Sequence, residues 1–470
     1  MPSSLRASLS RFRGFSRNAW LYLTSNTIQA FSAAAIGVVY TLFLQGAGFT
    51  LTFIGASLFL ATAGGAAAIL PASALVRRFG WRTMLLWSNY IGGVALFAQF
   101  IAPSPAVTLL TSLGVGASVA IFLVLNGPFL AACCRPDQRN AIFGLNNALG
   151  WLAAVTGALL GGWLPIWLRA ADVAGAARAS GPLVWLAPAL TTARPLLLAG
   201  AQARSYQEAI LLAGLVAIPS IIPIFMLGPM AAPEKPAGLV AESAPVSTLR
   251  ARVEVWLPQA RELVTGLIGK FSLSQMLVGL GAGLFFPFLN IYFVERLHAT
   301  TAFYGALTSV VTAGLAVVSL VSAPLADRFG QMRLALVAQI VSLPFMVVMG
   351  AFPALWVVAI AYVMRTALIN TGSAPEQAWL MDVIPPERRV VASNVYNASW
   401  QGAWAVGAAI AGPLISAAGY AAPFYLAAAL YATSAFLMFR WLLPSRISTV
   451  ASATVEPQTA ADGAGWASGE

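Results

Sequence analysis

Charged residues are scarce in this chain of 470 residues. Only 9% are Asp, Glu, Lys or Arg, whereas 59% are hydrophobic and the mean hydropathy is +0.81. Soluble domains carry about 25% charged and roughly 45–50% apolar residues. A chain with so few charges cannot cover a water-facing surface, so the composition excludes an ordinary soluble domain and indicates that lipid is its solvent.

Histidine and cysteine are scarcer still. The chain has one histidine, His298, and two cysteines, the neighbours Cys133 and Cys134. Adjacent thiols rarely bridge, so no disulfide framework is expected, and the usual His and Cys ligands of a zinc site are missing. No Gly-x-x-x-x-Gly-Lys-Ser/Thr loop for nucleotide phosphates occurs either. The sequence therefore predicts no metal, no cofactor, no ATP-driven pump and no enzyme.

What the chain does contain is long apolar runs. A helix needs about 20 apolar residues to cross a hydrocarbon core. The alternating pattern of a membrane β-barrel is absent, so helices are the remaining spanning structure. The sequence predicts an all-α membrane protein with twelve transmembrane helices, near residues 19–45, 52–75, 82–102, 105–133, 141–167, 207–229, 267–294, 301–324, 331–351, 354–381, 391–416 and 420–443.

Short fragments recur at a constant distance of 250 residues. Leu-Val-Arg-Arg-Phe-Gly at 75–80 corresponds to Leu-Ala-Asp-Arg-Phe-Gly at 325–330, and Pro-Asp-Gln-Arg at 136–139 to Pro-Glu-Arg-Arg at 386–389. An offset shared by loops and apolar runs indicates a duplicated unit. We therefore expect the twelve helices to form two pseudo-symmetric six-helix bundles.

The composition along the chain suggests four parts. Residues 17–228 and 267–443 would form the two bundles. Residues 229–266 are rich in proline and then mix charged and apolar residues, as in a cytoplasmic linker with an amphipathic helix on the membrane surface. Residues 444–470, rich in Ala, Ser, Thr and Gly, are expected to be a disordered cytoplasmic tail.

The basic residues predict the orientation in the membrane. Most of the 26 Lys and Arg residues fall in the segments that would be cytoplasmic if both termini were inside the cell. The segment at 169–206 is then an external loop, either a tolerated insertion or a lid over the outer opening. The net charge of +11 fits contact with anionic lipids of the plasma or inner membrane, and no nucleic-acid partner is needed.

Two loops resemble a known motif. Residues 323–333 read Ala-Pro-Leu-Ala-Asp-Arg-Phe-Gly-Gln-Met-Arg, and residues 73–82 read Ser-Ala-Leu-Val-Arg-Arg-Phe-Gly-Trp-Arg. With the repeat and the number of spans, they resemble the major facilitator superfamily of secondary transporters, whose pattern is Gly-x-Leu-Ala-Asp-Arg-x-Gly. The resemblance implies alternating access by two rocking bundles. It also implies a cytoplasmic latch, here made by Arg78, Gly80, Asp327, Arg328, Gly330 and Arg333.

The first loop departs from the family pattern because Arg77 stands where the family has Asp. Simple anchoring of the loop by positive charge explains this copy equally well. In the fifth span, Gly144, Gly157, Gly161 and Gly162 resemble the glycine-rich pattern of drug–proton exporters, although that pattern has Gly at Ala153 and Pro at Ala158. Close packing of neighbouring helices is the alternative explanation for these glycines.

Glu376 and Arg365 are the ionisable residues that lie deep inside a predicted span. Eleven residues of one helix separate them, which places both on nearly the same face. A charge at this depth is costly and is often functional. Glu376 is a candidate proton carrier, and Arg365 is a candidate for binding an anionic substrate group. The alternatives are a solvated vestibule acid and a structural hydrogen bond to backbone.

Polar residues inside the spans supply the candidate substrate site. Asn397, Trp400, Gln401 and Trp404 share one helical face. Amides hydrogen-bond a solute and indoles cover its apolar parts, although a single membrane amide more often bonds a neighbouring helix. The set also includes Asn147 and Trp151 in the fifth span, and Asn26 and Gln29 in the first span.

These features predict a secondary transporter that moves a small molecule, acts as a monomer and uses protons as the coupling ion. Proton-coupled export of an amphipathic compound is the leading expectation. Drug exporters of the family often have an acid in the first span and Arg in the fourth, which this chain lacks, so Glu376 would couple alone. The alternatives are uptake of a small polar or anionic nutrient, or a receptor or sensor that does not transport.

Overall fold

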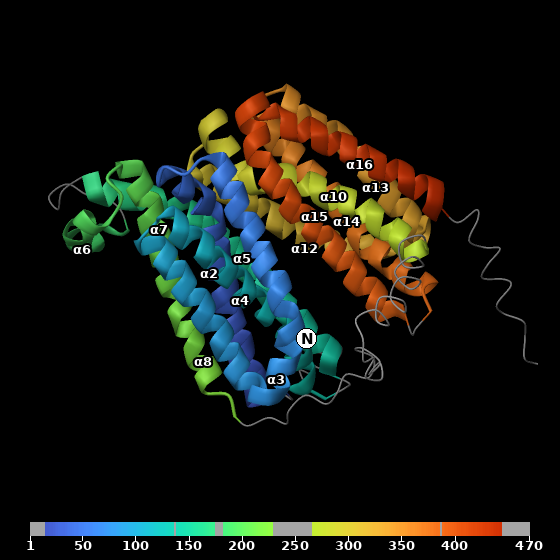
Figure 1. The fold of residues 1–470 in the computed structure, drawn as a ribbon, viewed down its shortest axis with the longest axis horizontal. Coiled ribbons are helices and arrows are strands. Elements are labelled where there is room, and N and C mark those ends of the chain that lie inside the picture. The colour runs from blue at the N-terminus through green and yellow to red at the C-terminus, as the bar shows by residue number, and fades with distance from the viewer. Residues whose placement is uncertain (1–14, 136–137, 174–181, 229–265, 386–387, 444–470) are drawn as a thin grey trace, which may run out of the picture.

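The computed structural model describes residues 15–135, 138–173, 182–228, 266–385 and 388–443. Within them it contains twelve helical segments long and apolar enough to cross a membrane, and no strand, which confirms the predicted fold class. The expected linker helix within 229–265 and the tail at 444–470 lie outside the described residues. Two groups of helices follow each other along the chain (Figure 1): α2 (Arg17–Gly46), α3 (Leu51–Ile101), α4 (Pro105–Ala132), α5 (Arg139–Val173), α6 (Ala187–Ala193), α7 (Ala201–Ala217) and α8 (Ile221–Phe225), then α10 (Leu267–Phe285), α11 (Leu289–Ile291), α12 (Thr301–Phe329), α13 (Gln331–Ala351), α14 (Leu355–Val383), α15 (Arg389–Ala418) and α16 (Ala421–Leu442).

Hydroxyl side chains mark the start of several helices. Ser16, Thr50, Ser104 and Thr300 each accept a hydrogen bond from the backbone N–H three residues later. Such N-caps satisfy one of the backbone donors that a helix leaves open. Thr50 and Thr300 are 250 residues apart, so the duplication extends to the way the helices begin.

Two glycines form the turns at one end of the bundles. Gly80 interrupts α3 with φ 79°, so this element comprises two membrane spans, and Gly330 joins α12 to α13 with φ 84°. Positive φ strains every residue with a side chain, which explains glycine at both positions. We call the end of the molecule that carries these two turns the basic-loop end, because Arg78, Arg82 and Arg328 flank them.

The seventh span is not one regular helix. The sequence predicts a span over 267–294, but α10 ends at Phe285. A 3-10 segment (Phe286–Phe288), the short α11 and a π-helical segment (Tyr292–Arg296) complete the span. Pro287 lies at the break and has no N–H to donate to the preceding turn. The irregular part brings Asn290 into contact with the first bundle, as described below.

The two bundles meet along two helix pairs, α3 with α15 and α5 with α12. These contacts, which we call the seam, involve the first turns of α3 and α12, at the end of each helix away from the glycine turns. Figure 1 shows the bundles side by side near the top of the view and separated at the opposite ends. The bundles therefore meet at one end, which we call the closed end, and their helices diverge toward the basic-loop end.

Glycines allow the close approach at the seam. A Cβ on Gly305 would lie 2.5 Å from the carbonyl oxygen of Ala158, and one on Gly55 would lie 2.4 Å from that of Ala408. Gly162 and Gly412 are packed equally tightly against Thr301 and Leu51. Each of these contacts in one half has its counterpart 250 residues away, so the seam is pseudo-symmetric down to single residues.

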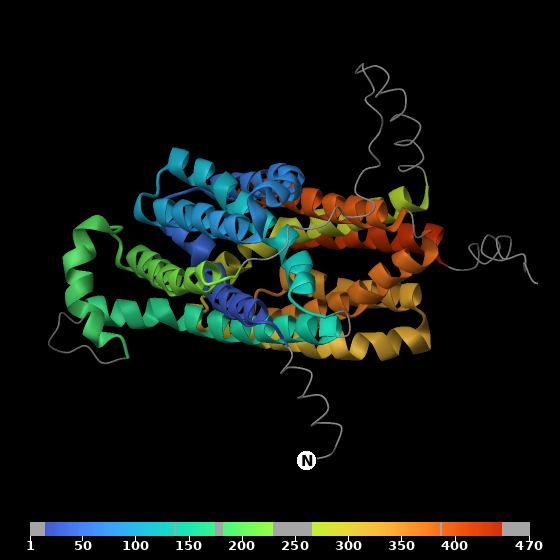
Figure 2. The same cartoon turned by 90° about the horizontal axis from the view of Figure 1, so that it is seen from below.

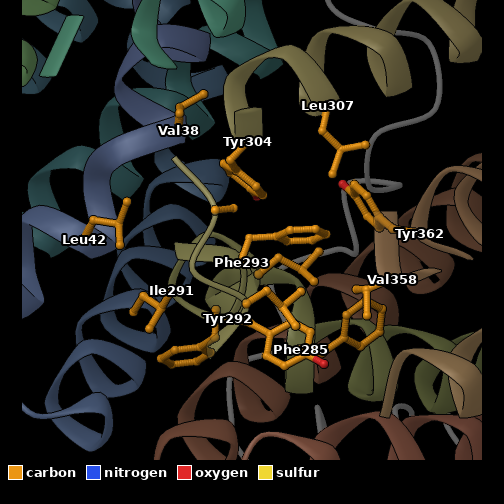
Figure 3. Packing of buried hydrophobic residues seen from close by; sticks show 14 of the residues in the cluster. Val38, Leu42, Phe285, Ile291, Tyr292, Phe293, Tyr304, Leu307, Val358 and Tyr362 are labelled. Atoms are coloured by element: carbon orange, nitrogen blue, oxygen red, sulfur yellow. The ribbon is translucent and has the colours of Figure 1, made fainter. Parts of the chain in front are cut away.

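Polar contacts and a shared core reinforce the seam. Thr41 of α2 and Asn290 of α11 share a 2.5 Å hydrogen bond, and the amide of Asn290 donates to the Val38 carbonyl at 3.1 Å. The Ser309 hydroxyl of α12 donates to the Val155 carbonyl of α5. Figure 3 shows side chains of one apolar cluster that come from both bundles, among them Val38, Leu42, Ile291 and Tyr304. One apolar core therefore continues from the first bundle into the second at the closed end.

The segment between the fifth and sixth spans contains helical turns of its own. Residues 182–200 form two 3-10 turns and α6, and they cross the end of the first bundle (Figure 2). Gln207 holds the end of this segment, because its side chain accepts from the Leu198 N–H and donates to the Phe100 carbonyl. The large side chains of Trp185 and Leu196 remain exposed.

Candidate functional site

Glu376 lies in the second bundle, inside the span formed by α14. Its side chain is buried, with 8% of its surface exposed, and one carboxylate oxygen accepts a hydrogen bond from the buried amide of Gln275 on α10. Within the described part of the chain this carboxyl group has a neutral partner and no ion pair. The structure thus places the predicted acid between two helices with a single amide bound to it.

Aromatic side chains surround the Glu376 and Gln275 pair. The ring of Phe271 stacks on Trp379 and lies against Tyr396 of α15. The hydroxyl of Tyr396 accepts from the exposed amide of Gln377, at 3.3 Å. The second bundle therefore carries a polar cluster, which we call the acidic cluster, formed by Gln275, Glu376, Gln377 and Tyr396 on three helices.

The first bundle carries a neutral cluster. The amide of Asn26 on α2 donates to the Asn146 oxygen on α5 at 2.7 Å, and the Tyr22 hydroxyl donates to the Asn126 oxygen on α4 at 3.0 Å. Gln29 bonds the hydroxyl of Ser25 within its own helix. Of the predicted residues, Asn26 and Gln29 thus lie in or beside one hydrogen-bonded group.

The two clusters occupy equivalent places in the duplicated halves. The 250-residue shift relates Asn126 to Glu376, Ser25 to Gln275 and Asn146 to Tyr396. Sequence reasoning did not select Gln275, Asn126 or Asn146. Applying the repeat offset to Glu376 alone would have found Asn126. The partners Gln275 and Asn146 depend on helix packing, which no local motif encodes.

The remaining candidate substrate-site residues lie on α5 and α15. Asn147 and Trp151 on α5, and Asn397 and Gln401 on α15, are exposed, and the Asn397 amide bonds its own helix through Ser393. Trp400 and Trp404 are half-buried where α15 packs on the glycines Gly279 and Gly283 of α10. The structure thus forms no hydrogen bond between any two of these predicted side chains among the described residues.

Arg365 lies inside the second bundle. Only 3% of its surface is exposed, its guanidinium donates to the Tyr431 hydroxyl at 2.5 Å, and it stacks on the rings of Phe285 and Tyr431. Its Nε is buried without a hydrogen-bond partner among the described residues. Aromatic faces attract a cation, so the rings of α10 and α16 hold this charge in place of a carboxylate.

The six predicted loop residues gather at the basic-loop end. Arg78 and Arg328 stack on the neighbouring rings of Phe79 and Phe329, each at 5.4 Å. Asp327 and Arg333 are exposed, and Gly80 and Gly330 form the turns. In this structure the loops of the two halves flank the open side of the molecule, where the bundles stand apart.

Residues 271–467 match the family model described as Major Facilitator Superfamily. This match covers less than half of the chain and agrees with the resemblance that the loops and the repeat indicate. None of the curated protein sequences compared with the chain matches it. The match agrees with the prediction from the sequence, which is a transporter of this family rather than an enzyme.

Solved transporter structures share the fold over nearly the whole chain. A bacterial homologue of the human lysosomal transporter Spinster, inward-facing and unoccupied, is 13% identical with a TM-score of 0.68, covering 90% of this chain and 96% of that chain. A bacterial homologue of the iron transporter ferroportin, also inward-facing, is 13% identical with a TM-score of 0.63 and coverages of 90% and 98%. A D-xylose–proton symporter is 14% identical with a TM-score of 0.61 and coverages of 92% and 98%. At these identities the likeness shows the fold, and the differing names assign no solute to this chain.

Proposed function

We propose that this protein is a transporter of the major facilitator type that exports an amphipathic small molecule in exchange for protons, with Glu376 as the group that carries the proton. The observation behind this proposal is a buried carboxyl group that accepts a hydrogen bond from the neutral amide of Gln275. A carboxyl group bound to a neutral donor can gain or lose a proton without breaking an ion pair. Ionisable groups that are retained inside a membrane span commonly serve proton transfer.

Closure at one end supports alternating access as the transport mechanism. Residues 17–228 would rock against residues 267–443, so that the seam opens as the basic-loop end closes. Because basic residues favour the cytoplasmic side, we place the basic-loop end and both termini in the cytoplasm. The present structure is then the inward-facing state of a monomer in the plasma or inner membrane.

The proposed substrate class follows from polar and aromatic side chains on α5 and α15. Asn147 and Trp151 of α5, with Asn397 and Gln401 of α15, are exposed on helices that form the seam at their other ends. Amides and an indole together suit a solute with both polar and apolar parts. The export direction rests on the resemblance of the fifth-span glycines to drug–proton exporters. Gly157, however, packs on Phe31 of α2, as close helix packing requires.

Reconstituted full-length protein tests the coupling. Vesicles containing a pH-sensitive dye would be mixed with a panel of solutes that includes a lipophilic fluorescent cation, and solute-driven proton movement would be recorded. Glu376→Gln should abolish this movement, because the amide cannot ionise. The matched control is Asp382→Asn, since Asp382 is an exposed acid on the same helix. Proton movement that survives Glu376→Gln would remove Glu376 from the mechanism.

One observation favours a second candidate, proton-coupled uptake of an anionic nutrient. Arg365 is a buried cation without a carboxylate partner in the described chain, and an anionic substrate group would balance its charge. Selective loss of transport of an anionic solute in Arg365→Gln would favour this candidate. Absence of saturable flux for every solute would instead leave a receptor or sensor on the same scaffold.

A further inference from the structure

A cavity of about 320 Å³ opens at the turn between α12 and α13. Its lining includes Arg328 and Arg333, the turn residues Phe329, Gly330, Gln331 and Met332, and Trp379 of α14. Arg328 stacks on the Phe329 ring, and neither arginine makes an ion pair with another described residue. Two arginines thus line one cavity, and in the described part of the chain no carboxylate forms an ion pair with either.

The backbone and the neighbouring acids leave the cavity positive. Gly330 caps α13 and offers no side chain to the first N–H groups of this helix of 21 residues, whose dipole adds positive potential. The Gln331 amide donates to Asp382 at 3.0 Å, so that carboxylate is bound by an amide and not by an arginine. Asp327 is exposed and does not line the cavity. The cavity therefore suits an anion.

The depth of the cavity in the membrane indicates where the anion comes from. The spans Thr301–Phe329 and Gln331–Ala351 both end at this turn, so the cavity lies at the level of the lipid headgroups. Phe329 at its margin is 52% exposed, so an apolar ring is available to contact the lipid beside the cavity. Lipid phosphates are concentrated at the same depth, whereas a soluble phosphate must be drawn from dilute solution.

We propose that this cavity binds the phosphate of an anionic phospholipid headgroup, with Arg328 and Arg333 as its ligands. Arginine pairs with phosphate through two parallel hydrogen bonds, which favours a defined site over diffuse attraction. The equivalent cavity at the α3 turn has a volume of about 250 Å³ and is lined by a single arginine, Arg82. The duplication thus supplies a weaker version of the same site within the same molecule.

Native mass spectrometry of the full-length protein tests the site with phosphatidylglycerol, and with phosphatidylcholine for comparison. Each arginine near an anionic membrane surface contributes roughly a 5-fold gain in binding. Arg333→Gln should therefore weaken phosphatidylglycerol binding about 5-fold, and Arg328→Gln with Arg333→Gln more strongly. Arg82→Gln should cause a smaller loss. The matched control is Arg440→Gln, an exposed arginine in the last turn of α16 that lines neither cavity.

Three outcomes would overturn the proposal. Equal losses in Arg333→Gln and Arg440→Gln would indicate diffuse attraction to any basic surface. Equal binding of phosphatidylcholine would show that anionic headgroups are not recognised. Displacement of the lipid by millimolar glycerol 3-phosphate would assign the cavity to soluble phosphates. Circular dichroism and melting temperatures of each variant would verify that the fold is unchanged.

Discussion

Adding one methyl group at Gly305 should open the seam between the bundles. The new Cβ would lie 2.5 Å from the Ala158 oxygen and 2.8 Å from the Gly162 Cα. Carbon atoms in ordinary contact are about 3.5 Å apart or more, so α5 and α12 would have to separate by roughly 1 Å. Both obstacles are backbone atoms, which cannot turn aside as a flexible side chain would.

The energetic effect can be estimated from overpacking elsewhere. Extra methylene groups in a tightly packed core cost about 1–3 kcal/mol, and this cost falls on the state in which the seam is closed. If the other end closes when the seam opens, Gly305→Ala should shift the balance between the two states by about 5-fold to 150-fold. The pseudo-equivalent Gly55→Ala should shift it in the same direction, because its Cβ would lie 2.4 Å from the Ala408 oxygen.

Distances between spin labels measure this shift. Ile101 and Phe352 are exposed at the ends of α3 and α13, beside the closed end and in different bundles. With Cys133 and Cys134 replaced by serine, labelled cysteines at these two positions should give a longer distance in Gly305→Ala. Gly314→Ala is the matched control on the same helix, since its Cβ would meet nothing within 4 Å. Identical distance distributions in Gly305→Ala and Gly314→Ala would refute the reasoning.

Three further predictions concern single residues. Asn290→Ala removes the hydrogen bonds that join α11 to Thr41 and to the Val38 carbonyl. At about 1 kcal/mol each, their loss should favour the open seam roughly 30-fold in the same distance measurement, and an unchanged distance would contradict this prediction. Cys133 is buried, whereas Cys134 is only partly buried, and a thiol must reach the reagent in order to react, so maleimide at pH 8 should label Cys134 first; equal labelling would count against this burial. Arg365→Met keeps an apolar stem but removes a buried charge that lacks a carboxylate partner among the described residues, so its melting temperature should not fall. A clear drop would show that the contacts with Phe285 and Tyr431 outweigh the cost of burying the charge.

The fold was predictable because its signals are repeated. Twelve apolar runs and the 250-residue offset give the number of spans and the two equal bundles. The same signals do not show where a span breaks. Pro287 could have pointed to the irregular seventh span, but prolines also lie within regular helices of this chain, such as Pro128 in α4 and Pro344 in α13. The break is set by contacts with the first bundle, which the sequence does not display.

The candidate site was predictable only in part. Glu376 stands out because a carboxyl group in an apolar run is rare. Its partner Gln275 is 101 residues away, and only the packing of α10 on α14 brings the two together. The glycines of the seam were visible in the sequence as repeated residues. Their contacts join different bundles, however, so their role could be recognised only once the two halves were placed relative to each other.

The duplication suggests where the functional asymmetry lies. The seam is nearly the same in both halves, because each glycine contact has its counterpart and each bundle must close against the other. The polar clusters are not the same, since Glu376 corresponds to Asn126, and Asn290 to Tyr40. A symmetric seam provides the movement, whereas a carboxyl group in one bundle alone would couple that movement to a single proton. We therefore expect the residues that differ between the two halves, rather than the repeated ones, to carry the chemistry of transport.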